Sequence, residues 1–380
     1  MIRFSFARKK TSLAVVLGVV LVVGGSIWML RDSLLAWYYL RGLAKAEQGE
    51  QAVWISRVVQ LDSAIVPGLI KGLEDDDLPR CANFCVALDG LARHWGFDNR
   101  RTHDLAGRIA DNFSHFSGHG QITALKLFGT WQLEISDYPA FNEIITRLSD
   151  GMLAEASRSD RDDVHLAALE VCERSLTLKR EPSKAIEKVV EACLNDTDVN
   201  NRLMAARLAC DSRVNLFKQV IPLLEDSEVE VRRAAMQIVA NQPGLSQFLG
   251  DDDLLRWLND PDSEVRRLCE GALAQRGLKP EAVQLGRLIT NAKPAVRLEV
   301  LKYLYPGSEL DANTWVRHLS HDPAPAVRSA AMRAAVQLDL RNLADRLDQM
   351  ARMDPSPTVR QLAQHYLAMQ QQGGNQKVRR

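Results

Sequence analysis

The sequence predicts an all-α protein, a right-handed α–α superhelix of stacked helix pairs that is preceded by one transmembrane helix. Three observations lead to this prediction. A short phrase recurs along the chain at intervals of roughly 30 to 34 residues, as in arrays of stacked repeats. Each copy begins an apolar stripe with helical spacing, and residues 11–30 form an uncharged apolar run. No alternating pattern of Val, Ile and Thr, as expected for strands, stands out.

The recurring phrase places an aspartate six residues before an arginine, and a valine directly before that arginine. The four full copies begin at Asp226, Asp260, Asp322 and Asp354. Their arginines are Arg232, Arg266, Arg328 and Arg360. The long interval between Arg266 and Arg328 contains one further copy at Arg297, where Asn291 replaces the aspartate. Such regular spacing marks a stacked array of repeats rather than a single compact domain.

Each copy continues as one stripe of an amphipathic helix. Apolar residues follow the valine at i+3, i+4 and i+7, as in Val231, Ala234, Ala235 and Ile238. The preceding Asp-Pro turn favours a helix start, because Asp can cap a helix and Pro suits its first turn. A second apolar helix lies upstream of each turn. Each unit is therefore helix, turn, helix, and it must stack on its neighbours to bury its apolar face.

These features resemble HEAT repeats. The match comprises the Asp-x5-Arg spacing, the Val, the small residue four positions after it and, in one unit, Pro67 eight residues before Asp75. The interval is shorter than the HEAT period of about 40–47 residues. The chain therefore resembles the compact variety called HEAT-like or lyase-type repeats, over residues 60 to 370.

The resemblance implies a structural ladder of charged side chains. In this repeat class the Asp caps the second helix and the Arg bonds to a neighbouring turn, which fixes the stacking angle. The predicted ladder residues are Asp75, Asp196, Arg202, Asp226, Arg232, Asp260, Arg266, Arg297, Asp322, Arg328, Asp354 and Arg360. A charged binding stripe is the alternative interpretation of the same residues, and we favour the structural one.

The repeat pattern weakens toward the N-terminus. Asp196 is kept, but Asn201 takes the position of the valine that follows it. In the unit before, Ser159 and His165 occupy the Asp and Arg positions. Farther upstream only the periodicity remains, at wider intervals between corresponding positions. The early units are therefore expected to carry longer helices or an irregular loop.

The segment from Thr11 to Leu30 has no charged residue and reaches the length of about 20 residues that a membrane-spanning helix needs. At about 1.5 Å per residue it crosses a hydrocarbon core of about 30 Å. Trp and Tyr residues follow it, as at a membrane interface. A cleaved signal peptide, with its apolar region from Leu13 to Val23, is the alternative. We favour an uncleaved anchor because the apolar run continues to Leu30.

The charges that flank this segment predict its orientation. Four cations precede it, Arg3, Arg8, Lys9 and Lys10, whereas Arg31 and Asp32 nearly cancel after it. The positive-inside rule then places the N-terminus in the cytoplasm and the repeats outside it. The chain is predicted to be a single-pass protein of the plasma or inner membrane.

The predicted organisation has five parts. They are a basic segment (1–10), the transmembrane helix (11–30), a helical connector or cap (31–62), the repeat solenoid (63–369) and a disordered tail (370–380). The tail is predicted to be disordered because it is polar and has no apolar face.

Composition excludes some classes of function. Lys plus Arg and Asp plus Glu both number 48, so no nucleic-acid partner is expected, since such binders usually show a basic excess. The six cysteines are scattered and do not form the pattern of a disulfide framework. No cofactor is expected, because the sequence has no Gly-rich phosphate loop, nucleophile elbow or paired Cys-x-x-Cys.

The nearest thing to a chemical site is a group of four histidines, His94, His103, His115 and His119. His115 and His119 are weak metal candidates, because two histidines at i and i+4 can share one ion. Glycines flank His119 on both sides, which makes a helix there doubtful. A loop with ordinary exposed histidines is the interpretation that we favour.

These features predict a membrane-anchored scaffold or adaptor without catalysis of its own. A protein partner would bind the concave face of the solenoid, and the chain would contact the membrane through Thr11–Leu30. One alternative is an enzyme or metal-binding protein that uses the region His94–His119. Another is a lyase-type HEAT-like protein, similar to the bilin lyases, for which no cofactor-handling residue can be carried over.

Overall fold

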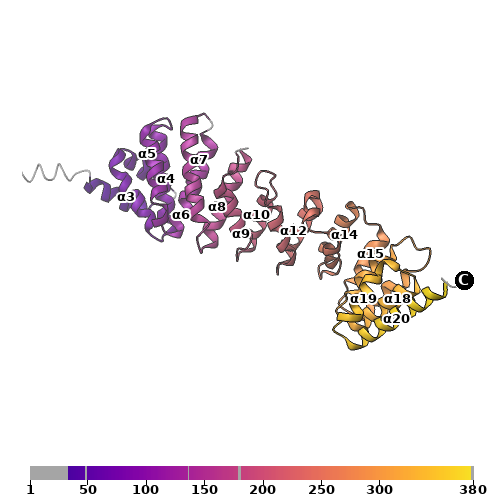
Figure 1. Ribbon diagram of the computed structural model, residues 1–380. Helices are drawn as coiled ribbons and strands as arrows, with labels where there is room; N and C mark the ends of the chain where they lie inside the picture. Colours follow the sequence, from indigo (N-terminus) through magenta and orange to yellow (C-terminus); the bar gives the residue numbers. More distant parts are fainter. Residues whose placement is uncertain (1–32, 48, 136, 179–180, 378–380) are drawn as a thin grey trace, which may run out of the picture. The chain divides into compact units, whose positions relative to one another are not determined.

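The computed structural model describes residues 33–47, 49–135, 137–178 and 181–377. Every regular element among these residues is a helix, and none is a strand (Figure 1). The all-α prediction is therefore confirmed for this part of the chain. The predicted basic segment and transmembrane helix, residues 1–30, lie outside it.

No single helix of the described residues has both the length and the apolar character needed to cross a membrane. One bent pair, Gln51–Val59 with Asp62–Glu74, passes the same test jointly, with an angle of 116° between its two parts.

Two compact units make up the chain, Met1–Gln219 (unit 1) and Val220–Arg380 (unit 2). The repeat array that the sequence predicts for residues 63–369 is thus divided between the two units. The boundary between the units lies within α11 (Phe217–Val220).

Unit 1 consists of two layers of helices. Its first described helix ends at residue 44. The elements that follow are α2 (Gln51–Val59), η1 (Asp62–Ile65), α3 (Val66–Lys71), η2 (Gly72–Glu74), α4 (Leu78–Trp95), α5 (Arg100–Asp111), η3 (Phe113–His115), α6 (Gly118–Glu134), α7 (Pro139–Ala156), α8 (Asp162–Thr177), α9 (Lys184–Cys193) and α10 (Val199–Ala209). Helices α3, α5, α7 and α9 contact one another in succession and form the first layer. Helices α4, α6, α8 and α10 do the same and form the second layer.

The helices of unit 1 are long, which is one of the two outcomes that the sequence leaves open for the early repeats. Helices α4 and α7 have 18 residues each, α6 has 17 and α8 has 16. Large aromatic side chains lie fully buried among them, including Trp131, Phe84, Phe128 and Phe141. Burial of these rings adds a large apolar contribution to the stability of this unit.

Unit 2 repeats the helix-pair arrangement with shorter helices, several of which tighten into 3₁₀ turns. Its elements are η4 (Ile221–Glu225), α12 (Val229–Asn241), η5 (Pro243–Gln247), α13 (Asp251–Leu254), η6 (Leu255–Asn259), α14 (Ser263–Gln275), α15 (Pro280–Ile289), α16 (Pro294–Arg297), η7 (Leu298–Tyr303), α17 (Ala312–Ser320), α18 (Pro325–Gln337), η8 (Arg341–Leu343), α19 (Ala344–Met353) and α20 (Pro357–Lys377). Among the second helices of the pairs, α12 contacts α14, and α16, α18 and α20 contact in succession.

The last helix is longer than the sequence predicts. Helix α20 runs to Lys377, so residues 370–377 are helical where a disordered tail is expected. Adding residues to an existing helix avoids the cost of nucleation, which offsets the low helix propensity of Gly373 and Gly374.

Candidate functional site

The aspartates of the ladder organise the turn between the two helices of a pair. In five turns the side chain accepts the backbone N–H of the residue two positions later, as Asp322 Oδ1 does from Ala324 at 2.7 Å. The other four aspartates with this bond are Asp196, Asp226, Asp260 and Asp354. The bond closes a short Asx turn, for which Asp and Asn are suited.

This geometry corrects the role that the resemblance implies for the aspartate. The N-cap of the second helix is the residue two positions later, Asp198 in α10, Asp262 in α14 and Ala324 in α18. The ladder aspartate therefore fixes the turn that leads into the helix and does not cap the helix itself. The chain leaves the turn over these two positions before it becomes helical.

Each ladder arginine donates hydrogen bonds to the backbone of its own turn. Arg328 Nη1 donates to the backbone oxygens of Asp322 (2.8 Å) and Pro323 (3.0 Å), six and five residues earlier. The same pair of bonds is made by Arg202, Arg232, Arg266, Arg297 and Arg360. This contact explains why the arginine follows the aspartate at a fixed distance of six residues.

The other side of the guanidinium reaches the aspartate of the next repeat. Arg297 donates through Nε and Nη2 to Asp322 at 2.6 and 2.8 Å, and Arg328 does so to Asp354 at 2.8 and 2.7 Å. Arg232 makes a longer pair of bonds with Asp260, at 3.1 and 3.3 Å. We call each such Arg–Asp pair a rung. A rung fixes the position of one turn relative to the next, because both partners bind in a two-pronged geometry.

Two rungs are buried. Arg297, Asp322, Arg328 and Asp354 are each only 5–7% exposed. The hydrogen bond to Asp354 raises the pKa of Arg328, and Asp322 raises the pKa of Arg297 in the same way. Burial acts to raise the pKa of Asp354, but the hydrogen bonds from Arg328 and the Ser356 N–H outweigh it and hold that pKa below its usual value. Both partners of this rung are therefore charged at neutral pH.

The ladder changes where the sequence departs from its phrase. Asn291 keeps the turn bond, since its Oδ1 accepts the Lys293 N–H at 2.9 Å, but it carries no charge. Asp75 makes an exposed ion pair with Arg80 within its own turn (2.6 Å; 49% and 38% exposed). Asp75 is therefore not half of a buried rung, because this pair is exposed and both its partners belong to one turn. Ser117 links the two repeats there instead, through a 2.8 Å bond to the Asp75 carbonyl oxygen.

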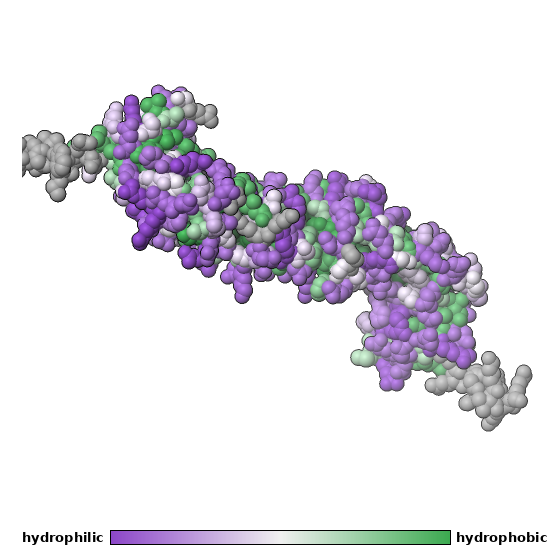
Figure 2. All heavy atoms as spheres, turned by 90° about the horizontal axis from the view of Figure 1, so that it is seen from above, coloured by the Kyte–Doolittle hydropathy of each residue, from purple (hydrophilic) through white to green (hydrophobic). Residues whose placement is uncertain are grey.

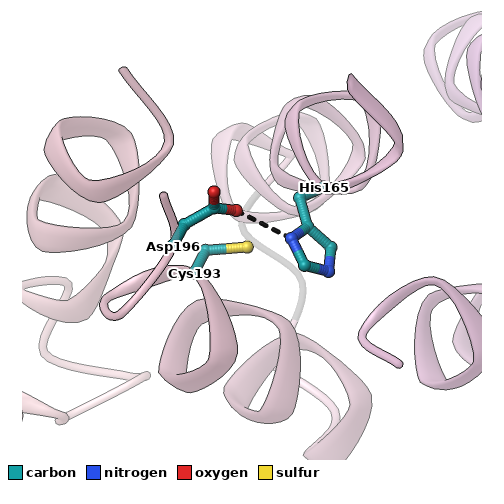
Figure 3. Close-up of side chains that lie close together, drawn as sticks. All are labelled: His165, Cys193 and Asp196. Carbon is teal, nitrogen blue, oxygen red and sulfur yellow. Dashed lines mark hydrogen bonds and ion pairs between the residues drawn. The ribbon is translucent and has the colours of Figure 1, made fainter. Parts of the chain in front are cut away.

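The largest departure lies between α8 and α9, where a histidine takes the place of a ladder arginine. His165 Nδ1 lies 2.7 Å from Asp196 Oδ2, so the histidine keeps the contact with the next repeat. The sulfur of Cys193, the last residue of α9, points toward the same place (Figure 3). One ring nitrogen, the sulfur and one carboxylate oxygen all lie within 4.8 Å of one another. Among the described residues this is the one group of three such side chains.

Burial determines the protonation of this group. The Cys193 thiol has a pKa raised to about 12, because burial and the charge of Asp196 both oppose ionisation. Burial also acts to raise the pKa of Asp196, but hydrogen bonds from the Asp198 N–H, His165 and Asn201 hold it below its usual value. The cysteine is thus a thiol, which is a poor nucleophile, and the aspartate is an anion.

Sequence reasoning does not find this group. The sequence shows that His165 stands at the Arg position, but it does not distinguish Cys193 from the other scattered cysteines. The signal that could have revealed this group is the sequence spacing between the two partners of a rung. Rungs join residues 25–28 positions apart, and the His165–Asp196 pair is the equivalent contact at 31 positions.

The four histidines that the sequence singles out do not form one site. His94 is exposed on α4, and His103 bonds the Phe97 carbonyl oxygen at 2.9 Å and stacks on Phe141. His115 is exposed in η3. His119 pairs with Asp76 at 2.9 Å. The two weak metal candidates, His115 and His119, thus belong to no group of three ligand side chains in the described part of the chain.

His119 lies in the first turn of α6, not in a loop, which corrects the prediction. Ser117 caps this helix by accepting the Gly120 N–H at 3.1 Å. A Cβ atom added at Gly120 would overlap the carbonyl oxygen of Leu73. The glycine is therefore needed for close packing of α6 against the preceding repeat, and it does not mark a loop.

The outer side of the second layer in unit 1 is partly apolar. Val86 on α4, Leu133 on α6 and Leu166 on α8 are 44%, 52% and 37% exposed. A groove of about 270 Å³ runs between α4 and α6, and its walls include Val86 and Leu127. Figure 2 shows hydrophobic residues lying among hydrophilic ones on the visible surface. Contiguous apolar patches are typical of protein-binding surfaces, whereas single exposed apolar side chains are common on any protein.

Comparisons with known proteins add no family assignment. No protein-family model matches the chain, and no curated protein matches it.

Proposed function

We propose that this chain is a membrane-anchored repeat protein of the HEAT-like type that serves as a scaffold or adaptor and performs no reaction of its own. Its helix pairs would follow a right-handed superhelix. The outer side of the second layer would form the concave side of this superhelix, and a protein partner would bind there. The observation that carries the proposal is the apolar outer side of the second layer in unit 1, with the groove between α4 and α6.

The stacking of the repeats supports a binding role. Within unit 1 the second helices α4, α6, α8 and α10 pack on one another in succession, and within unit 2 the Arg–Asp rungs join consecutive turns by paired hydrogen bonds. A surface formed from several helices that cannot slide past one another is presented to a partner with little loss of conformational entropy. Val86, Leu133 and Leu166 belong to three different helices of the second layer, so a partner can contact several repeats at once.

The location of the protein belongs to the same proposal. The segment Thr11–Leu30 would hold the chain in the plasma or inner membrane with its N-terminus in the cytoplasm. The two helical units would then lie on the far side of the membrane and bind a partner there.

Affinity enrichment from cells with full-length protein tests the binding proposal. We expect Val86→Glu and Leu166→Glu to release a set of partners that wild type retains, because each places a charge in an apolar contact. Arg147→Glu on α7, an exposed position in the first layer, is the matched control and should retain them. Equal recovery of every co-purified protein by all three variants would contradict this placement of the binding surface.

A further inference from the structure

Two departures from the ladder fall together between α8 and α9. His165 stands at a position where the other repeats carry a ladder arginine. Cys193 stands three residues before Asp196. The residues three positions before the later ladder turns are all apolar: Leu223, Trp257, Leu288, Leu319 and Ala351. A histidine and a cysteine thus replace an arginine and an apolar residue around one aspartate, and all three side chains meet (Figure 3).

Replacing the ladder arginine by a histidine leaves polar groups around Asp196 without hydrogen-bond partners. Arg232, Arg297 and Arg328 bond both their own turn and the next aspartate, but the imidazole of His165 is too short to do both. His165 Nε2 is buried and has no protein partner. Asn201, which is 1% exposed and donates to Asp196 Oδ2 at 3.0 Å, likewise has a buried Oδ1 without a protein partner. The histidine rung thus differs from the arginine rungs in leaving two polar atoms beside Asp196 without a protein partner.

We propose that His165, Cys193 and Asp196 together bind a divalent transition-metal ion of the zinc type. Imidazole nitrogen, thiolate sulfur and carboxylate oxygen are the three kinds of ligand that Zn²⁺ takes in proteins. Their donor atoms lie within 4.8 Å of one another, which a small movement converts into bonds to one ion. Helix α8 holds the histidine, and the end of α9 with its following turn holds the other two, so the ion would join consecutive repeats as a rung does.

Binding of the ion requires two proton movements. The nitrogen of His165 that bonds to the metal must give up its proton, and the imidazole can carry that proton on its other nitrogen. The Cys193 thiol must release its proton to solvent, because thiolate is the form that bonds to the metal. Each ion bound therefore releases one proton.

Titration of the untagged full-length protein in detergent with Co²⁺ alone tests the proposal. Thiolate-bound Co²⁺ has a charge-transfer absorption in the near ultraviolet, which wild type should show at one ion per chain and lose when Zn²⁺ is added. Cys193→Ser should weaken binding by at least about 100-fold, since loss of groups outside the ligand set already costs about 10–100-fold. Cys172→Ser, which removes a buried thiol on the neighbouring helix α8, is the control and should keep the absorption.

His165→Arg tests the proposal with a variant that should fold well, because it restores the residue found at the other ladder positions. We expect it to melt no lower than wild type and to lose the Co²⁺ absorption. The absence of this absorption in wild type, or its persistence in Cys193→Ser or His165→Arg, would overturn the proposal. If Cys193→Ser fails to fold, the His165→Arg result decides alone.

Discussion

Arg232, Arg297 and Arg328 each make two kinds of contact that a lysine cannot combine. One nitrogen of its planar head binds the carbonyl oxygens of its own turn, while the opposite edge binds a carboxylate of the next repeat, as Arg328 does with Asp322 and Asp354. Lysine has a single ammonium group and cannot present two edges. The recurrence of arginine in the phrase follows from this geometry and requires no ligand.

Loss of a buried rung should destabilise unit 2. Arg328→Ala leaves Asp354, which is 5% exposed, without its counter-ion, at a cost of about 3 kcal/mol, the lower end for a broken buried ion pair. Arg233→Ala removes an exposed pair with Asp262 and should change the denaturation midpoint little. Urea unfolding of both variants checks the difference. Equal midpoints for the two would show that the ladder is not structural.

Replacing Asn291 by aspartate should raise stability, because this turn carries no charge. Asn291→Asp should keep the turn bond to Lys293 and place a carboxylate opposite Arg266, in the register of the other rungs. The expected gain is about 0.5–1 kcal/mol, which is modest because the site is partly exposed. The gain should vanish in an Arg266→Met background, as a double-mutant cycle by thermal unfolding would show. A gain that survives in that background must have another cause.

Stability should depend on pH through the ladder carboxylates. The pKa of Asp354 and that of Asp196 are lower in the folded chain than their ordinary value of 3.8. Their contribution to the free energy of unfolding is therefore fully present above that value and is lost as pH falls through it toward the folded pKa. The melting temperature should be flat near neutral pH and fall below about pH 4. A melting temperature that stays constant under strong acid would contradict this account.

At the scale of the element, the sequence predicts best where the repeat phrase is intact. From Asp226 to Ala363 the stripe after each Val-Arg identifies the second helices, and the structure has helices there. In unit 1 the phrase survives only in part, as at Asp196 and Arg202, and farther upstream only periodicity remains, so helix lengths could not be predicted. The metal-ligand group escapes sequence reasoning for a related reason. Its residues are separated in sequence, and only the stacking of α8 on α9 and α10 brings them together.

Two glycines in helices of unit 1 should respond to substitution in opposite directions. At Gly107 in α5 an added Cβ would have no neighbouring atom within 4 Å, so Gly107→Ala should stabilise by about 0.5–1 kcal/mol through helix propensity. Gly120→Ala would collide with the backbone of Leu73 and should destabilise by about 1–3 kcal/mol. Thermal unfolding of the two variants measures both. A stabilising Gly120→Ala would mean that α6 is not packed against the preceding repeat.

At the scale of the whole molecule, the proposed topology makes a separate prediction. Protease added to intact cells or spheroplasts should digest the helical units, because the cations before Thr11 favour a cytoplasmic N-terminus. Survival of the units until the membrane is permeabilised would reverse the orientation. Recovery of a soluble form that begins near Ser26 would show that the apolar segment is a cleaved signal.

The central claim is that the outer side of the second layer in unit 1 binds a protein partner. Site-specific photo-crosslinking in cells tests it most directly, with a photoreactive residue at Val86 or Leu166 and, as the control, at Arg147 in the first layer. We predict that the two second-layer positions link the full-length chain to the same partner and that the Arg147 position does not. Adducts at none of these positions, or equal adducts at all three, would contradict the claim.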